Sequence, residues 1–96
     1  MSAKTAIQLS EGDNVAVVLS NVDKGDMVAP MSITAREPIP RGHKIATAPV
    51  RDGDAVLKYG QIIGFASAHI APGEHVHVHN VSMGESLTVM TPCHAV

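Results

Sequence analysis

The sequence repeats a short motif in which two aliphatic residues flank a central glycine, with two residues on either side of the glycine. It occurs five times in the chain, at residues 9–15, 22–28, 39–45, 50–56 and 70–76. Glycine adopts the positive φ of a tight turn at low steric cost, and its charged, polar or proline neighbours keep the turn in water. The two aliphatic residues of each motif are therefore expected to point into a common core. The spacing between the motifs is irregular, so we do not expect a solenoid of fixed period.

The runs between these turns favour β-structure. Strands are predicted at 15–19, 31–35, 44–50 and 75–81, whereas the alanine-rich second half of 55–70 fits either a short helix or another strand. Aromatic residues make up only 2% of the 96 residues, so Val, Ile, Ala, Leu and Met must build the core. We predict a mostly β single domain over residues 1–96. Its core would span 7–81, and the tail at 82–96 would form a terminal strand or pack on a partner.

Composition excludes several classes of partner. The net charge is −2 and no run of like charge occurs, so a nucleic acid or an anionic membrane surface is not an expected partner. Cys93 is the single cysteine, which rules out an internal disulfide. The first 14 residues lack the apolar region of a secretory signal, and no apolar stretch approaches the roughly 20 residues needed to cross a bilayer, so we expect neither a signal peptide nor a membrane span. The expected location is the cytoplasm.

Three histidines alternate with valines in the segment HVHVH at residues 75–79. On a flat strand they would share one face, with neighbours roughly 7 Å apart and the outer pair about 13 Å apart. That spacing lets two of the three converge on one metal ion. Equally, they would form the solvated face of an edge strand whose inner face is Val76 and Val78. Further metal ligands would have to come from His43, His69 or Glu74.

Two glycine corners carry cationic side chains. The Gly-His-Lys corner at 42–44 exposes backbone amides and side-chain donors that suit a carboxylate ligand. In the second corner, Lys58 suits an anion, Tyr59 can donate a hydrogen bond or a proton, and Gly60 permits close approach of a ligand to the backbone. The simpler interpretation makes both corners ordinary turns, with Tyr59 as the large aromatic of the core and Lys58 extended along the surface.

Taken in order, these motifs resemble those of a known family. RGHKIA at 41–46, VLKYGQIIGFASAHIAPGEHVHVHN at 56–80 and GDNVAVVL at 12–19 are similar to the N-terminal segment of altronate and galactarate dehydratases. They are also similar to the small subunit of sulfolactate sulfo-lyase. The resemblance covers residues 7 to 81. It implies a SAF domain, which is a small β-clip fold with several tight glycine turns and little helix.

The resemblance also implies a function. Enzymes of this family eliminate water, or sulfite in the sulfo-lyase, from hydroxy acids, and they depend on a divalent metal such as iron or manganese. The chain would be the small subunit or the N-terminal domain of such a lyase, inactive without a large catalytic dehydratase-like subunit. Sugar-acid dehydration is the first expectation. The alternatives are sulfolactate cleavage, a non-catalytic sugar-acid-binding module and a purely structural subunit. Assembly into a homo-oligomer is a separate expectation about partners.

The resemblance further assigns roles to individual residues. Catalysis falls to His77, His79 and Tyr59. Substrate binding falls to His43, Lys44, Lys58 and Asn80. Metal binding falls to His77 and His79, with His75, which matches the family motif more loosely, as a further candidate. Which histidines bind metal and which bind substrate stays open at this point.

Overall fold

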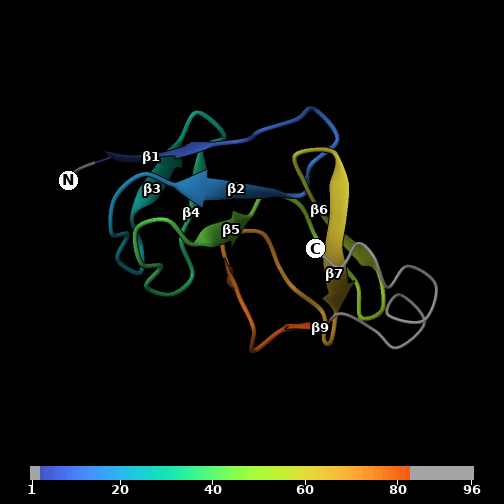
Figure 1. Ribbon diagram of the computed structural model, residues 1–96. Helices are drawn as coiled ribbons and strands as arrows, with labels where there is room; N and C mark the ends of the chain where they lie inside the picture. The colour runs from blue at the N-terminus through green and yellow to red at the C-terminus, as the bar shows by residue number, and fades with distance from the viewer. Residues whose placement is uncertain (1–2, 83–96) are drawn as a thin grey trace.

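The structure is a computed structural model that describes residues 3–82, and these residues form two small sheets (Figure 1). The strand order is β4-β3-β1-β2-β5-β8 in the first sheet and β6-β7-β9 in the second. The strands are β1 (Ala3–Ile7), β2 (Val15–Val18), β3 (Met27–Ala29), β4 (Ile33–Thr34), β5 (Lys44–Ala46), β6 (Ala55–Lys58), β7 (Gln61–Ala66), β8 (His75–Val76) and β9 (Val81–Ser82). The described residues contain no helix, which confirms the mostly β prediction. Beyond Ser82, the predicted tail lies outside the described residues.

The aliphatic residues of the five turn motifs are buried, as predicted, except for Leu9. They do not, however, share one core. The motifs at 22–28 and 39–45 contribute to one cluster, and those at 50–56 and 70–76 contribute to a second. Strands β2 and β5 serve both clusters, because neighbouring residues of a strand point to opposite faces. Ile45 thus packs in the first cluster and Ala46 in the second.

The two clusters are built by the same backbone pattern used twice. Val22 and Ile39 exchange hydrogen bonds of 2.9 and 2.8 Å, and Val50 and Ile70 exchange hydrogen bonds of 2.9 and 2.7 Å. The corner glycines repeat the correspondence. Gly25 donates to Ala35 and Gly53 to Ala66, each at 2.8 Å, while Gly42 donates to Val18 and Gly73 to Ala46, each at 2.9 Å. The irregular spacing of the motifs therefore conceals two similar units that share β5.

The segment at 55–70, which was ambiguous in sequence, forms the hairpin of β6 and β7 rather than a helix. The two strands pair from Ala55 opposite Phe65 to Lys58 opposite Gln61, with an irregular register after Val56. None of the described segments is a helix that could span a membrane.

The continuous strand predicted at 75–81 is wrong. Strand β8 ends at Val76, residues 77–80 form a turn, and β9 begins at Val81. The backbone N–H of Asn80 donates to the His77 carbonyl at 3.1 Å, which closes the turn. Val78 consequently does not face the interior, and 80% of its surface is exposed.

Candidate metal and anion site

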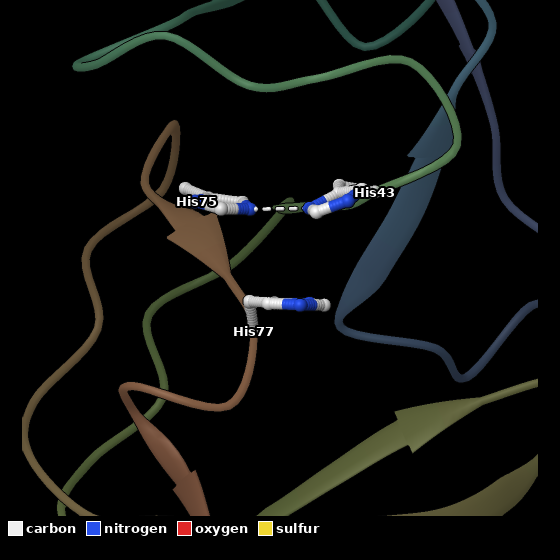
Figure 2. A group of neighbouring side chains, drawn as sticks. All are labelled: His43, His75 and His77. Carbon is white, nitrogen blue, oxygen red and sulfur yellow. Dashed lines mark hydrogen bonds between the residues drawn. The ribbon is translucent and has the colours of Figure 1, made fainter.

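The pairing of β5 with β8 brings His43 and His77 together. The antiparallel register sets Ile45 opposite His75 and Lys44 opposite Val76, so the next positions along the two segments are those of His43 and His77. Their rings lie 4.3 Å apart between centroids, at an interplanar angle of 25°. Figure 2 shows the two side chains one above the other.

His75 completes a three-histidine cluster, and all three of its side chains are half-buried. Its Nε2 lies 2.9 Å from Nδ1 of His43, and the two rings meet edge to edge (Figure 2). One nitrogen of this pair donates and the other accepts, so at least one of the two is unprotonated at the contact. One ligand atom from each of His43, His75 and His77 falls within 4.8 Å of the others.

The turn at 77–80 therefore gives a different cluster from that expected of a flat strand. His79, expected to lie far from His75, comes within 5.2 Å of it between ring centroids, in a tilted arrangement. It is exposed and lies outside the three-histidine group. Of the further ligands considered from sequence, His43 joins the group, whereas His69 is exposed and outside it. Glu74 is also outside, and its Oε2 accepts the Ala71 N–H at 3.1 Å.

Asn80 holds the histidine turn from inside. Its side chain is buried, with Oδ1 accepting the His77 N–H at 3.0 Å and Nδ2 donating to the His75 carbonyl at 2.9 Å. Its own carbonyl accepts the Ser67 N–H at 2.9 Å, which ties the turn to the end of β7. This geometry gives Asn80 a positioning role. The substrate contact that the resemblance assigns to it stays a prediction.

Sequence reasoning missed Glu37, which fixes the other side of the turn. Glu37 Oε2 accepts the backbone N–H of His75 at 2.9 Å, across 38 positions of sequence. One residue earlier, the Arg36 N–H donates to the Gly73 carbonyl at 2.9 Å. No local sequence pattern predicts either contact, because only the tertiary fold brings residues 36–37 beside residues 73–75.

The cluster favours uncharged imidazoles. Burial, followed by the charges of the three neighbouring histidines, lowers the pKa of His75, and the Glu37 carboxylate opposes this shift. Burial and then the charge of His43 lower the pKa of His77, with a further contribution from Lys44. Neutral imidazole is the form that binds a metal ion or accepts a proton.

Lys44 and Lys58 extend this region as a cationic pair. Burial, and then the charge of Lys58, lowers the pKa of the Lys44 ammonium. Both side chains are half-buried. A carboxylate placed between them would relieve the repulsion between two cations in a region of reduced solvation.

Tyr59 lies at the exposed tip of the β6–β7 hairpin. Its side chain is 69% exposed, so the interpretation that it is the large aromatic of the core is wrong. Within residues 3–82, no hydrogen bond or ring contact joins it to the histidines. The structure thus brings together His43, Lys44, His75 and His77, with His79 beside them. Tyr59 lies apart from this group, in the turn between β6 and β7.

The donor set fits a divalent metal ion. Adjacent ligands of an octahedral ion with bonds near 2.1 Å lie about 3.0 Å apart, and the 2.9 Å contact between His43 and His75 is close to that value. The rings lie within 28° of parallel in all three pairs, so coordination requires side-chain rotation. It also requires loss of the hydrogen bond between His43 and His75, because both nitrogens must offer lone pairs.

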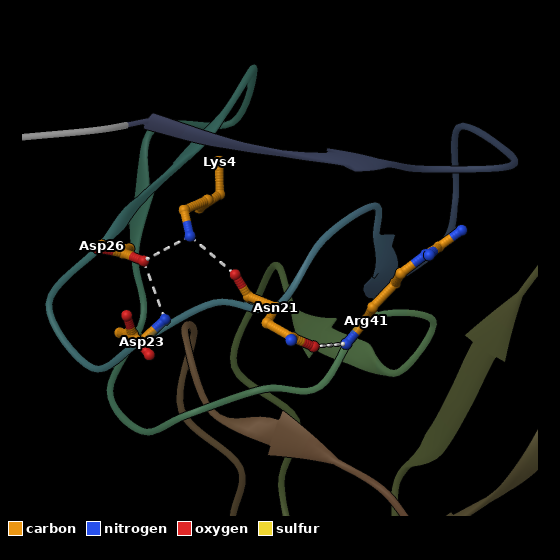
Figure 3. Close-up of polar contacts among 5 residues, drawn as sticks. All are labelled: Lys4, Asn21, Asp23, Asp26 and Arg41. Carbon is orange, nitrogen blue, oxygen red and sulfur yellow. Dashed lines mark hydrogen bonds and ion pairs between the residues drawn. The ribbon is translucent and has the colours of Figure 1, made fainter.

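A shallow depression of about 340 Å³ adjoins His75, with Pro38, Ile39 and Pro40 among its lining residues. Its rim includes Asn21, whose side chain accepts the Arg41 N–H at 2.8 Å (Figure 3). The residues drawn in Figure 3 also include Lys4, which donates to the Asn21 carbonyl at 2.8 Å and pairs with Asp26 at 3.3 Å. These contacts connect β1 to the residues around the depression, so the role of the network is structural.

Comparison with known proteins confirms the resemblance noted in the motifs. Residues 4–84 match the family described as the altronate/galactarate dehydratase SAF domain. The chain is 42% identical over 79 residues to altronate dehydratase of Bacillus subtilis and 43% identical over 76 residues to that of Escherichia coli. These matches take in 80% and 77% of this chain. It is also 36% identical over 73 residues, or 68% of its length, to (2R)-sulfolactate sulfo-lyase subunit alpha of Chromohalobacter salexigens.

The relatives differ greatly in length. The chain spans 16% and 15% of the two altronate dehydratases, but 78% of the sulfo-lyase subunit. The same domain thus occurs as a small region of a larger dehydratase and as most of a separate subunit.

Proposed function

Because the chain belongs to the altronate/galactarate dehydratase SAF-domain family, we propose that it is the small component of a lyase that removes water from hydroxylated sugar acids. A large dehydratase-like chain would be its partner, and the active site would form where the two meet. The three-histidine cluster beside two lysines carries this proposal. Together they supply ligands for a divalent ion and countercharges for a carboxylate.

His43, His75 and His77 would hold the ion, which we propose to be iron or manganese. When bound, such an ion acts as a Lewis acid toward an oxygen of the substrate. The three imidazoles are neutral ligands, so they leave the ion's charge available to an anionic substrate or to carboxylates of the partner. Asn80 and Glu37 would keep the turn at the position from which His75 and His77 reach the ion.

The remaining side chains would bind and orient the hydroxy acid. Lys44 and Lys58 would pair with its carboxylate, which holds the neighbouring carbon in a fixed place. Elimination then needs a base for the proton on the carbon next to the carboxylate and a donor for the departing hydroxyl. His79 is exposed, stands beside His75 and lies outside the three-histidine group, so it is our candidate for moving a proton.

Sulfite elimination from sulfolactate is the second candidate reaction. It is favoured by length, because the chain covers 78% of a sulfo-lyase subunit and 16% of an altronate dehydratase. Identity does not separate the two reactions, since it is 42% and 30% to an altronate and a galactarate dehydratase, and 36% and 44% to two sulfo-lyase subunits. The two reactions share the carboxylate and the proton next to it, and they differ only in the leaving group.

Reconstitution with a large dehydratase-like chain from the same genome tests the proposal. The purified complex would be given altronate, galactarate and sulfolactate in turn, with the 2-keto product and free sulfite measured. We expect one substrate class to turn over in the complex and none with either chain alone. A complex that turns over none of these hydroxy acids would contradict a lyase role. Binding of sugar acids by the isolated chain, without a partner, would indicate a binding module instead.

A further inference from the structure

The turn between β6 and β7 has a conformation that its sequence does not favour. Tyr59 has φ of +62° and Gly60 has φ of +73°. Two-residue hairpin turns with positive φ at both positions prefer Asn-Gly or Asp-Gly, because the left-handed region is costly for residues with bulky side chains. Asparagine would therefore suit position 59 better than tyrosine does. The stability of the hairpin therefore does not explain the tyrosine at this position.

Asp13 holds this turn from a different part of the chain. Its Oδ2 accepts the Tyr59 N–H at 2.7 Å and its Oδ1 accepts the Gly60 N–H at 2.8 Å. Asp13 is only 7% exposed as a residue, and its carboxylate makes charge-assisted hydrogen bonds to both N–H groups. The adjacent Asn14 accepts the Leu57 N–H at 2.8 Å and donates to the Ala55 carbonyl at 3.0 Å. Residues 13 and 14 thus fix β6 and its turn together.

The fixed turn displays an aromatic side chain in solvent. Tyr59 is the only tyrosine in the chain, and 69% of its surface is exposed. Ile62, three residues further along, is 50% exposed. An exposed tyrosine on a rigid turn, with an aliphatic neighbour, is typical of the anchor residues of protein interfaces.

The relatives supply a candidate partner for this tip. In the altronate dehydratases the matched region is only 15–16% of the chain, so most of each protein lies outside it. We propose that Asp13 fixes the turn at 58–60 so that Tyr59 docks against the large dehydratase chain, at a contact separate from the histidine cluster. This inference rests on the proposed function, because it takes the large chain as the partner. It also gives Tyr59 a binding role in place of the catalytic role that the resemblance implied.

The positioning step can be measured on this chain alone. Labelling with ¹⁵N-tyrosine gives one amide resonance, because the chain has a single tyrosine. In the wild-type protein the short bond to the Asp13 carboxylate should place that amide proton downfield. We expect Asp13→Asn to move the resonance upfield, and Asp52→Asn, which removes an exposed carboxylate, to leave it unchanged. An unchanged chemical shift of the Tyr59 amide proton in Asp13→Asn would overturn the positioning role of Asp13.

The docking step needs the complex with the large chain. We expect Tyr59→Asn to raise the melting temperature of the isolated chain, since asparagine suits the turn, while weakening binding to the large chain by about tenfold or more. Tyr59→Phe keeps the ring and should bind within about threefold of wild type. Asp13→Asn should weaken binding to an intermediate extent, and Asp52→Asn should bind as wild type does.

The outcomes separate this inference from the proposed function. A wild-type complex that turns over substrate, and binds the Tyr59→Asn chain equally well, overturns the docking role alone. Loss of turnover in Tyr59→Phe at unchanged affinity overturns it too, because the phenol would then be a proton donor. Self-association of this chain that Tyr59→Asn abolishes would assign the tip to a second copy instead. Failure of the wild-type chain to bind the large chain would overturn the proposed function and the docking role together.

Discussion

Gly73 and Gly53 form a matched pair that tests how the fold positions the histidine turn. They occupy the two glycine corners of the second unit, with φ of +93° and +90°. A Cβ atom at Gly53 would meet nothing within 4 Å. At Gly73 it would collide with the carbonyl oxygen of Thr34 and lie 3.1 Å from Cγ of Arg36. The backbone penalty is therefore common to both sites, and the steric penalty belongs to Gly73 alone.

The magnitudes follow from these two terms. Alanine in the left-handed region costs about 1 kcal/mol relative to glycine, so Gly53→Ala should lower the free energy of unfolding by that amount. Gly73→Ala adds a backbone collision, and overpacking of this kind costs about 1–3 kcal/mol. Its total should therefore reach about 2–4 kcal/mol. Because the displaced segment leads directly into His75, the variant should also bind Mn²⁺ more weakly, whereas Gly53→Ala should bind it as the wild type does.

Urea unfolding followed by circular dichroism measures the first effect, and isothermal titration with Mn²⁺ measures the second. Equal destabilisation by the two substitutions would refute the reasoning, since it would mean that Thr34 does not crowd Gly73. A Gly73→Ala protein with unchanged Mn²⁺ affinity would show that this corner does not set the position of His75.

Three further predictions concern the same scaffold. Asn80→Ala leaves the His77 N–H and the His75 carbonyl without their partners, so urea unfolding should show that the free energy of unfolding falls by about 2 kcal/mol. Titration with Mn²⁺ should show weaker binding. Unchanged stability and unchanged Mn²⁺ affinity would contradict the positioning role of Asn80. Burial acts to raise the pKa of Asp13, but hydrogen bonds from backbone N–H groups outweigh it and lower the pKa below 3.8. The stabilisation by the ionised Asp13 carboxylate is complete above pH 3.8 and is lost as the pH falls through the lower pKa of the folded state. The stability of Asp13→Asn should therefore lack this dependence on acidic pH. Because burial and neighbouring charges lower the pKa values of His75 and His77, the loss of Mn²⁺ affinity on acidification should occur at lower pH than for ordinary imidazole ligands, and an affinity that acidification leaves unchanged would contradict their assignment as ligands.

Much of the fold could be predicted from the turn motif. A glycine flanked at fixed distances by aliphatic residues is a local signal, and the buried positions it marks were correct except at Leu9. The division into two clusters was not predictable in the same way. It depends on β2 and β5 lying side by side, with neighbouring residues facing opposite sides of the shared sheet.

The histidine segment shows where the local signal failed. Alternating His and Val fits a strand, but the alternation ends at Val76 because Asn80 bonds back to His77 and closes a turn. Asparagine is a common turn residue, so its position after His79 was a signal that could have limited the strand. The turn makes His43 rather than His79 the third member of the cluster.

Other residues gave no signal at all. Glu37 reaches His75 across 38 positions, and Asp13 reaches Tyr59 across 46. Each is an ordinary acidic residue in sequence, and its role comes only from the partner that the fold sets beside it. Such long-range contacts to backbone N–H groups cannot be predicted from spacing.

The central claim is that His43, His75 and His77 form the metal-binding part of a lyase active site. The most direct test is the iron and manganese content of the reconstituted complex, measured together with turnover of its hydroxy acid, for His77→Ala and for His69→Ala as an exposed control. The account predicts that His77→Ala loses both the metal and the turnover while His69→Ala keeps both. Metal and turnover that survive in His77→Ala would contradict it.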